Sequence, residues 1–322
     1  MRILLVKLSS LGDVIHNLPV ASDLARAFPG AVIDWAVETP YAAIAAMHPA
    51  ISQVLPVPLR HLKKNWWSGA AWSAFLSSRS RLRCEQYDTI LDTQGLLKSA
   101  WIAHWPYGTV SGFAESSARE PLAARFYNRT YEVSRECHAV ERNRLLAARA
   151  FGYQIDKPPD YGIAHSEQST KRDVPYVVCL HATSRRNKMW PDDHWRELGL
   201  RLNSAGFQTV LPWGSASERD ISQRIARQLT NVDVPDALSL ANAAALLAGS
   251  ACVVGVDTGL AHLAVALGRP TIGIYVTTEP RLTGLYGGER TINLGGGSID
   301  EPAAPDIDAV WNALRPWLER TR

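Results

Sequence analysis

The chain has 322 residues, a length that favours two domains. Its 46% apolar and 20% charged residues exclude intrinsic disorder, a collagen-like repeat and a small disulfide scaffold. The net charge is only +3, which does not favour a nucleic-acid partner, and the four cysteines form no C-x-x-C pair that would indicate a zinc or dithiol site. We therefore expect a globular protein that binds no nucleic acid.

Strand-like and helix-like segments alternate along the whole chain. The first half is predicted to hold strands at 1–8, 32–38 and 87–92, and helices at 14–28 and 138–150. A polar segment without periodicity, residues 164–173, predicts a linker. After it we expect strands at 176–181, 208–211, 251–256 and 271–275, and helices at 194–204, 217–229, 240–248 and 260–267. This alternation predicts two doubly wound α/β domains.

Both ends of the chain carry further signals. The apolar start, residues 1–8, is too short for a signal peptide, so we expect a cytoplasmic location. Residues 307–318 have apolar side chains at helical spacing on one broad face. Such a face needs a partner surface.

In open α/β sheets, ligands bind where strands end and helices begin. The first such turn has the sequence SSLGD at residues 9–13, where small residues let a ligand approach the backbone. Asp13, at the start of the following helix, is a candidate general base. From spacing alone, a helix cap that complements the helix dipole is the favoured interpretation of Asp13.

A second turn, DTGLAH at residues 257–262, also joins a strand to a helix. The helix start with Thr258 and Gly259 offers N–H and hydroxyl donors to a phosphate, and His262 lies within one turn of them. In the alternative interpretation Asp257 caps the helix, Gly259 only packs, and His262 is an ordinary half-buried histidine.

Two further segments are rich in cations. After the first strand of the second half, Thr183, Ser184 and Lys188 could stabilise a diphosphate leaving group, although a basic loop taken alone is more often simply solvated. Residues 60–67, RHLKKNWW, suit an anionic and partly apolar surface such as lipid headgroups. The other interpretation of this second segment is a solvated helix face whose tryptophans point inward.

Six motifs, in family order over nearly the whole chain, resemble the ADP-heptose:lipopolysaccharide heptosyltransferases. They are SSLGDVIH at 9–16, DTQGLLKS at 92–99, REPL at 119–122, KMWPDDHW at 188–195, LPWG at 211–214 and DTGLAHL at 257–263. The resemblance implies a GT-B fold, in which two Rossmann-like domains face each other across a cleft. The acceptor would bind to residues 1–165 and ADP-heptose to residues 174–304, and the C-terminal helix, 305–322, would cross back to the first domain.

The same resemblance implies a reaction. Heptose would pass from ADP-L-glycero-β-D-manno-heptose to the first Kdo of Kdo2-lipid A, with inversion at the anomeric carbon and without a metal or other cofactor. The enzyme would be peripheral on the cytoplasmic face of the inner membrane, whose anionic surface would also give the apolar face of the C-terminal helix its partner.

The family's site residues are carried over onto matching positions. Asp13 would be the catalytic base, and Lys188 would stabilise the departing diphosphate. Glu218 would bind the adenosine ribose. The remaining donor contacts would be Thr183, Ser184, Asp257, Thr258, Gly259, Leu260 and His262. The acceptor contacts would be Ser10, Gly12, Arg60, Lys63, Lys64, Gln94, Lys98 and Arg119.

Two other functions fit the same motifs. A sister heptosyltransferase acting on an already heptosylated core would share the donor site. A nucleotide-binding module without transferase activity would need no base facing a leaving group, so the presence of both Asp13 and Lys188 argues against it. The absence of G-x-x-x-x-G-K-[ST], G-x-G-x-x-G and H-E-x-x-H leaves P-loop, standard dinucleotide and zincin functions without support.

Overall fold

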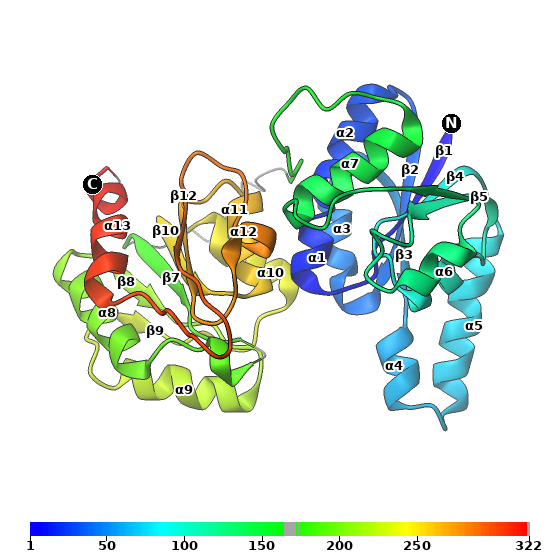
Figure 1. Cartoon of the computed structure of the whole chain (residues 1–322). Helices are drawn as coiled ribbons and strands as arrows, with labels where there is room; N and C mark the ends of the chain where they lie inside the picture. Colours follow the sequence, from blue (N-terminus) through cyan, green and yellow to red (C-terminus); the bar gives the residue numbers. More distant parts are fainter. Residues whose placement is uncertain (164–171, 173, 184, 321–322) are drawn as a thin grey trace. The chain divides into compact units, whose positions relative to one another are not determined.

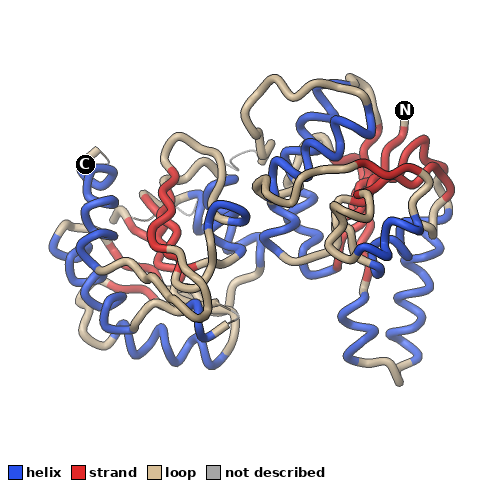
Figure 2. Tube along the Cα trace, viewed as in Figure 1, coloured by secondary structure: helices blue, strands red, loops and turns tan. Residues whose placement is uncertain are grey.

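The chain forms two compact units, Met1–Ala164 and His165–Arg322. The computed structural model describes residues 1–163, 172, 174–183 and 185–320 (Figure 1). The linker predicted at 164–173 therefore lies almost entirely outside the described residues. Each unit contains one six-stranded, fully parallel sheet, with helices lying on both of its faces (Figure 2).

In the first unit, strands and helices alternate along the chain. Its strands are β1 (Arg2–Val6), β2 (Val32–Glu38), β3 (Ile51–Val57), β4 (Gln86–Asp92), β5 (Tyr107–Phe113) and β6 (Arg129–Tyr131). Its helices are α1 (Leu11–Ile15), α2 (Leu18–Ala27), η1 (Thr39–Tyr41), α3 (Ala42–Ala46), α4 (Leu59–Lys64), α5 (Gly69–Arg83), α6 (Leu97–Ala103), η2 (Pro121–Phe126) and α7 (Ala139–Phe151). The helix predicted at 14–28 is two helices, because Pro19 lies at the start of α2 and cannot continue α1.

The second unit repeats this plan. Its strands are β7 (Tyr176–Leu180), β8 (Gln208–Val210), β9 (Val232–Asp233), β10 (Cys252–Val256), β11 (Thr271–Tyr275) and β12 (Thr291–Gly295). Its helices are η3 (Arg186–Lys188), α8 (Asp192–Ser204), α9 (Ala216–Ala226), α10 (Leu240–Ala248), α11 (Gly259–Ala266), α12 (Pro280–Thr283) and α13 (Ile307–Glu319). The central strands β7, β10 and β11 are buried along their whole length, which explains their continuous apolar sequences.

Both sheets have the same strand order. The first runs β3-β2-β1-β4-β5-β6, and the second, in the same sense, β9-β8-β7-β10-β11-β12. In the first sheet, β2 and β3 are added on one side of β1, and β4, β5 and β6 are then added on the other side. In the second sheet, β8 and β9 lie on one side of β7, and β10, β11 and β12 lie on the other. The reversal creates a switch point between β1 and β4 in the first sheet and between β7 and β10 in the second, and ligands of open α/β sheets bind at such points.

The C-terminal helix does not follow the prediction. Its buried residues Val310, Leu314 and Leu318 join the core of the second unit, where α13 contacts α8, β10, β11 and β12. The prediction that residues 305–322 return to the first domain is therefore wrong, and so is the expectation that the apolar face is left for a membrane. Across the described ranges, no helix combines the length and apolarity needed to cross a membrane.

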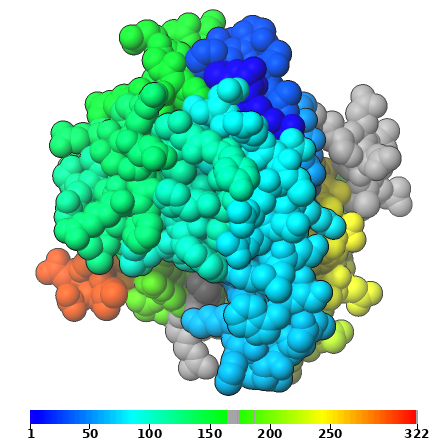
Figure 3. All heavy atoms as spheres, turned by 90° about the vertical axis from the view of Figure 1, so that its right-hand side faces the viewer, coloured from blue at the N-terminus to red at the C-terminus, as the bar shows by residue number. Residues whose placement is uncertain are grey.

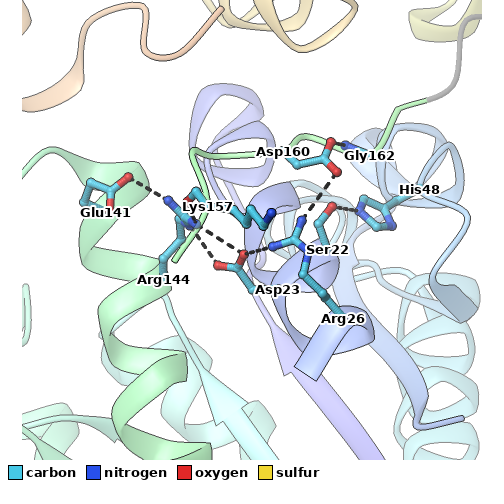
Figure 4. A network of polar contacts seen from close by, with 9 residues as sticks. All are labelled: Ser22, Asp23, Arg26, His48, Glu141, Arg144, Lys157, Asp160 and Gly162. Carbon is cyan, nitrogen blue, oxygen red and sulfur yellow. Dashed lines mark hydrogen bonds and ion pairs between the residues drawn. The ribbon is translucent and has the colours of Figure 1, made fainter. Parts of the chain in front are cut away.

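A buried polar network joins α2 to α7 in the first unit (Figure 4). Arg144 on α7 donates from Nε and Nη2 to the two carboxylate oxygens of Asp23 on α2, at 2.8 and 3.2 Å. Nη2 also donates to the carbonyl of Lys157, at 2.7 Å, and Nη1 pairs with Glu141. Because both central side chains are almost fully buried, this network fixes α7 and the segment after it against α2.

Candidate active site

The turns that carry the predicted residues lie at the switch points of the two sheets. In the first unit, Asp13 follows β1 and Gln94 follows β4, and these two strands are neighbours. In the second, Lys188 follows β7 and Asp257 follows β10, again a neighbouring pair. The repeated strand order therefore brings together residues that are far apart in sequence.

Gln94 makes three hydrogen bonds to the turn after β1. Its Oε1 accepts hydrogen bonds from the backbone N–H groups of Leu8 and Ser9, at 2.9 and 3.2 Å, and its Nε2 donates to the Ser9 carbonyl, at 2.6 Å. The buried carboxylate of Asp92 in turn accepts from the Gln94 N–H, at 2.8 Å, and from the Tyr127 hydroxyl, at 2.8 Å. Gln94 thus contacts the turn that leads into Ser10 and Gly12.

Asp13 is partly exposed in the first turn of α1. Its Oδ2 accepts hydrogen bonds from the N–H and the hydroxyl of Ser10, at 2.7 and 2.9 Å. The capping interpretation is therefore confirmed, but it occupies one carboxylate oxygen only. Within the described ranges Oδ1 accepts no hydrogen bond, so it is available to a ligand proton.

Two of the predicted acceptor residues meet beside this turn. Glu38, at the end of β2 and 2% exposed, pairs with Arg60 through Nε at 2.6 Å and with Lys98 at 3.2 Å. Lys98 also donates to the Ser9 hydroxyl, at 2.8 Å, and the Arg60 guanidinium lies 5.3 Å from the centre of the Tyr41 ring. The result is a set of cations at the carboxyl edge of β1 and β2, suited to an anionic ligand.

Lys7 is a member of this site that the sequence analysis did not select. It directly follows β1, is 6% exposed, and donates from Nζ to the Thr93 carbonyl, at 2.8 Å, with Asn143 at 3.4 Å. Burial lowers the pKa of Lys7, while the nearby negative charges of Asp13 and Asp92 act to raise it. The available signal was a cation in an otherwise apolar run.

The other predicted acceptor residues lie apart from this set. Lys63 and Lys64 are exposed on α4, and no hydrogen bond or ion pair connects them to Arg60 or Lys98 in the described part of the chain. Arg119 is exposed after β5, although its charge reaches Lys7 and acts to lower that residue's pKa. The interpretation that the tryptophans of this segment point inward is wrong, as they are strongly exposed.

In the second unit, Lys188 and Asp257 form one contact across the switch point. Lys188 Nζ lies 2.5 Å from Asp257 Oδ2, with both side chains mostly buried, and the Thr183 hydroxyl donates to the Asp257 carbonyl, at 3.2 Å. Asp257 does not cap α11, because the N-cap residue is Thr258, whose side chain makes no capping bond. The N–H groups of Gly259 and Leu260 in the first turn therefore keep their usual capacity to bind an anion.

The remaining donor candidates lie on the helices that follow β8 and β10, or outside the described residues. Glu218 on α9 accepts a hydrogen bond from the Gly214 N–H, at 2.7 Å, after β8. His262 is buried on α11, and Ser184 lies outside the described residues. The structure describes no group of three or more His, Cys, Asp or Glu side chains that could hold a metal ion.

Buried His181, directly after β7, supports the helix that carries Glu218. His181 Nε2 lies 2.7 Å from the Ser222 hydroxyl, which itself donates to the Glu218 carbonyl, at 3.2 Å. Burial lowers the pKa of His181 to about 4, so the ring is neutral at pH 7. Sequence analysis did not select this residue, because an isolated histidine after a strand has no distinctive pattern.

Comparison with known proteins shows to which family this chain belongs. A profile of glycosyltransferase family 9 (heptosyltransferase) matches residues 75–308. Lipopolysaccharide heptosyltransferase 1 of Pseudomonas aeruginosa is 47% identical over 309 residues, covering 95% of this chain and 86% of that protein. The chain belongs to glycosyltransferase family 9. Lipopolysaccharide heptosyltransferase 1 of Escherichia coli K12 is 43% identical over 296 residues, covering 91% of this chain and 93% of that protein.

Solved structures of the family agree with the fold. The E. coli heptosyltransferase WaaC with ADP matches with a TM-score of 0.91 and 39% identity, over 98% of this chain and 100% of that one. WaaC with ADP-2-deoxy-2-fluoro heptose matches with a TM-score of 0.86 and 38% identity, over the whole of both chains. The predicted GT-B fold of two Rossmann-like domains is confirmed, and so is the prediction that this family 9 chain is a glycosyltransferase.

Proposed function

We propose that this family 9 enzyme transfers heptose from ADP-heptose to the first Kdo of Kdo2-lipid A, as a step in lipopolysaccharide core biosynthesis. The proposal includes inversion at the anomeric carbon and no metal cofactor. The observation that carries it is the arrangement of Lys188, Asp257 and the start of α11 at the second switch point, which suits a diphosphate. The relatives named lipopolysaccharide heptosyltransferase 1, and WaaC with ADP, support the same assignment.

On the donor side, the chemical problem is the negative charge that develops on ADP as the glycosidic bond breaks. Lys188 supplies a fixed cation, oriented by Asp257 at 2.5 Å. The first turn of α11 adds N–H donors and the positive end of a helix dipole. Because these groups are already in position, they stabilise the leaving group with little reorganisation. Glu218 would bind the adenosine ribose.

On the acceptor side, the chemical problem is to remove a proton from a Kdo hydroxyl. Asp13 would take this proton on Oδ1 while Oδ2 stays bonded to Ser10. The hydroxyl then attacks the anomeric carbon from the face opposite ADP, which inverts the configuration. A positioned general base contributes roughly 10²- to 10⁴-fold in rate, or about 3 to 5 kcal/mol.

The acceptor itself carries carboxylates on its Kdo sugars and phosphates on lipid A. Arg60 and Lys98, gathered by Glu38 beside Ser9, are suited to the Kdo carboxylates. Lys63, Lys64 and Arg119, which are more exposed, would contact more distant anionic groups of the acceptor. Because the acceptor is a lipid, the enzyme would work as a peripheral protein on the cytoplasmic face of the inner membrane.

The test is a mass-spectrometric transfer assay with purified enzyme, ADP-heptose and Kdo2-lipid A in the presence of EDTA, with Asp13→Ala in parallel. We expect the wild type to add one heptose and the variant almost none, while both bind ADP. Transfer only to an already heptosylated core would refute the acceptor assignment and favour the sister enzyme. ADP binding without transfer to either acceptor would favour a binding module, and loss of activity in EDTA would refute the metal-free mechanism.

A further inference from the structure

One surface of the first unit carries more cations and exposed indoles than the proposed acceptor contacts of Arg60, Lys63 and Lys64 use. It is the α4–α5 hairpin, two helices that run side by side and extend away from the sheet (Figure 1). From residue 39 to residue 84 the sequence contains six Lys and Arg side chains and no Asp or Glu, whereas the net charge of the whole chain is only +3. The hairpin is therefore strongly cationic on a chain that is otherwise slightly acidic.

The end of the hairpin is also apolar. Trp66 and Trp67, in the loop between the two helices, are 66% and 72% exposed, and their rings contact each other edge to face. Trp72, on the first turn of α5 and 46% exposed, donates from Nε1 to the Trp66 carbonyl, at 2.8 Å. Figure 3 shows that the hairpin forms the lower end of this face of the first unit.

This apolar surface continues from the hairpin end toward α6. Trp72 contacts the buried ring of Phe75, which stacks on Trp101 of α6 with ring centres 5.8 Å apart. Trp101 is 50% exposed, and Leu76, on the same helix as Phe75, is 52% exposed. Exposed apolar side chains scattered singly need no explanation, but a connected set on a hairpin with six cations and no carboxylate indicates an interaction surface.

We propose that the α4–α5 hairpin docks on an anionic lipid bilayer, with Trp66 and Trp67 in the interfacial region and the cations of the hairpin against acidic headgroups. The inference rests on the proposed function, since an enzyme whose acceptor is a membrane lipid must reach the bilayer. Indole rings are favoured at the membrane–water interface because one end is apolar and the other donates a hydrogen bond. Basic residues near an anionic membrane add about 1 kcal/mol each.

Charge favours a bilayer over a protein partner. Lys63, Lys64, Arg79 and Arg81 are exposed, and their side chains form no ion pair or hydrogen bond within the described ranges. An interface with one specific protein usually depletes lysine and alternates charges to fix the register. A surface with only positive charge and with indoles at its end matches a continuous negative surface, which requires no register.

The experiment measures co-sedimentation of the full-length enzyme with vesicles that contain no acceptor. The probes are mixed phosphatidylethanolamine–phosphatidylglycerol vesicles and pure phosphatidylcholine vesicles. We compare the wild type with Trp66→Ser/Trp67→Ser and with Arg79→Gln/Arg81→Gln. The matched controls are Ile299→Ser, at a strongly exposed apolar residue, and Arg149→Gln, at an exposed cation outside the hairpin.

We expect the wild type to prefer the anionic vesicles, and the preference to fall with added salt. Removing cations should lower partitioning about fivefold per charge. The tryptophan variant should lose about tenfold in partitioning, because less apolar area is buried in the interface. Both control variants should bind as the wild type does, and transfer to a water-soluble, deacylated acceptor should remain normal in the tryptophan variant.

The proposal would be overturned if the wild type did not bind anionic vesicles, or if the hairpin variants bound them as well as the controls. A hairpin-dependent dimer in the absence of lipid would assign the surface to a second copy of the chain instead. Since these vesicles contain no acceptor, vesicle binding without any transfer would refute the proposed function alone. Transfer without hairpin-dependent binding would refute the docking surface alone.

Discussion

Replacing Asp13 with Asn or with Ala separates its two possible roles. Oδ2 accepts two hydrogen bonds from Ser10, so Ala removes a helix cap, at a cost of about 0.5 to 2 kcal/mol in the free energy of unfolding. Asn keeps one acceptor oxygen at this position, so its cost should be only a few tenths of a kcal/mol. Neither residue can take a proton at neutral pH, so both should lose roughly 10²- to 10⁴-fold in kcat.

The assay combines initial rates of heptose transfer with urea unfolding and ADP binding for each variant. A matched control is Ser239→Ala, which removes the N-cap of α10 by deleting the hydroxyl that accepts from the Asn242 N–H, at 3.1 Å. This control should lose about 1 kcal/mol of stability and keep its transfer rate. If Asp13→Asn transferred heptose at nearly the wild-type rate, or if the rates followed the stabilities, Asp13 would be a cap and not a base.

Three other expectations follow from single contacts. Lys188→Met should lower kcat by roughly 10²- to 10³-fold with a smaller change in the KM for ADP-heptose, and initial rates that showed the reverse split would contradict its role at the leaving group. Arg144→Met should cost about 3 to 5 kcal/mol in urea unfolding because Asp23 stays buried without its partner, whereas the double variant Asp23→Leu/Arg144→Met should recover most of this. Burial lowers the pKa of His48 and of His181 to about 4, below the unfolded value near 6.5, so their contributions to stability are intact above pH 6.5 and are lost as the pH falls toward 4. At pH 5 the free energy of unfolding should therefore be about 2 kcal/mol lower for each of the two histidines. Unfolding curves of His48→Gln with the same pH dependence as the wild type would refute this.

The central part of each sheet could be predicted from sequence because buried parallel strands are continuous apolar runs. The strands at 32–38 and 271–275 and the helix at 240–248 have the predicted bounds. The strands β3, β5, β6, β9 and β12 were not predicted. Several are short, polar or interrupted by Gly or Pro, as in β3 with Pro56 and β5 with Gly108 and Gly112, so they are defined by pairing with a neighbour and not by their own composition.

Only part of the candidate site could be predicted from the sequence. Asp13, Gln94 and Asp257 could be selected because strand-to-helix turns of an α/β chain meet at one edge of the sheet. The contacts of Lys7 and of Glu38 depend on which side chains converge across β1, β2 and β4, and no local pattern records that. The apolar face of α13 could be predicted from the helical spacing of its apolar residues. The surface that covers this face could not be predicted, because spacing shows only that the face must be covered.

The α4–α5 hairpin shows why composition alone left two interpretations open. In a helix with cations and tryptophans, indoles that point inward and indoles that point outward have the same sequence, and only the surrounding elements decide between them. Here α4 is six residues long, and the loop with Trp66 and Trp67 begins directly after it, at the end of the hairpin farthest from the sheet (Figure 1). Burial of these rings would gain about 25 cal/mol per Å² of apolar surface, yet they are left mostly exposed. A partner that covers these rings would therefore gain the free energy of burying them. Because residues 39 to 84 contain no carboxylate, the charge of the hairpin favours a negatively charged partner.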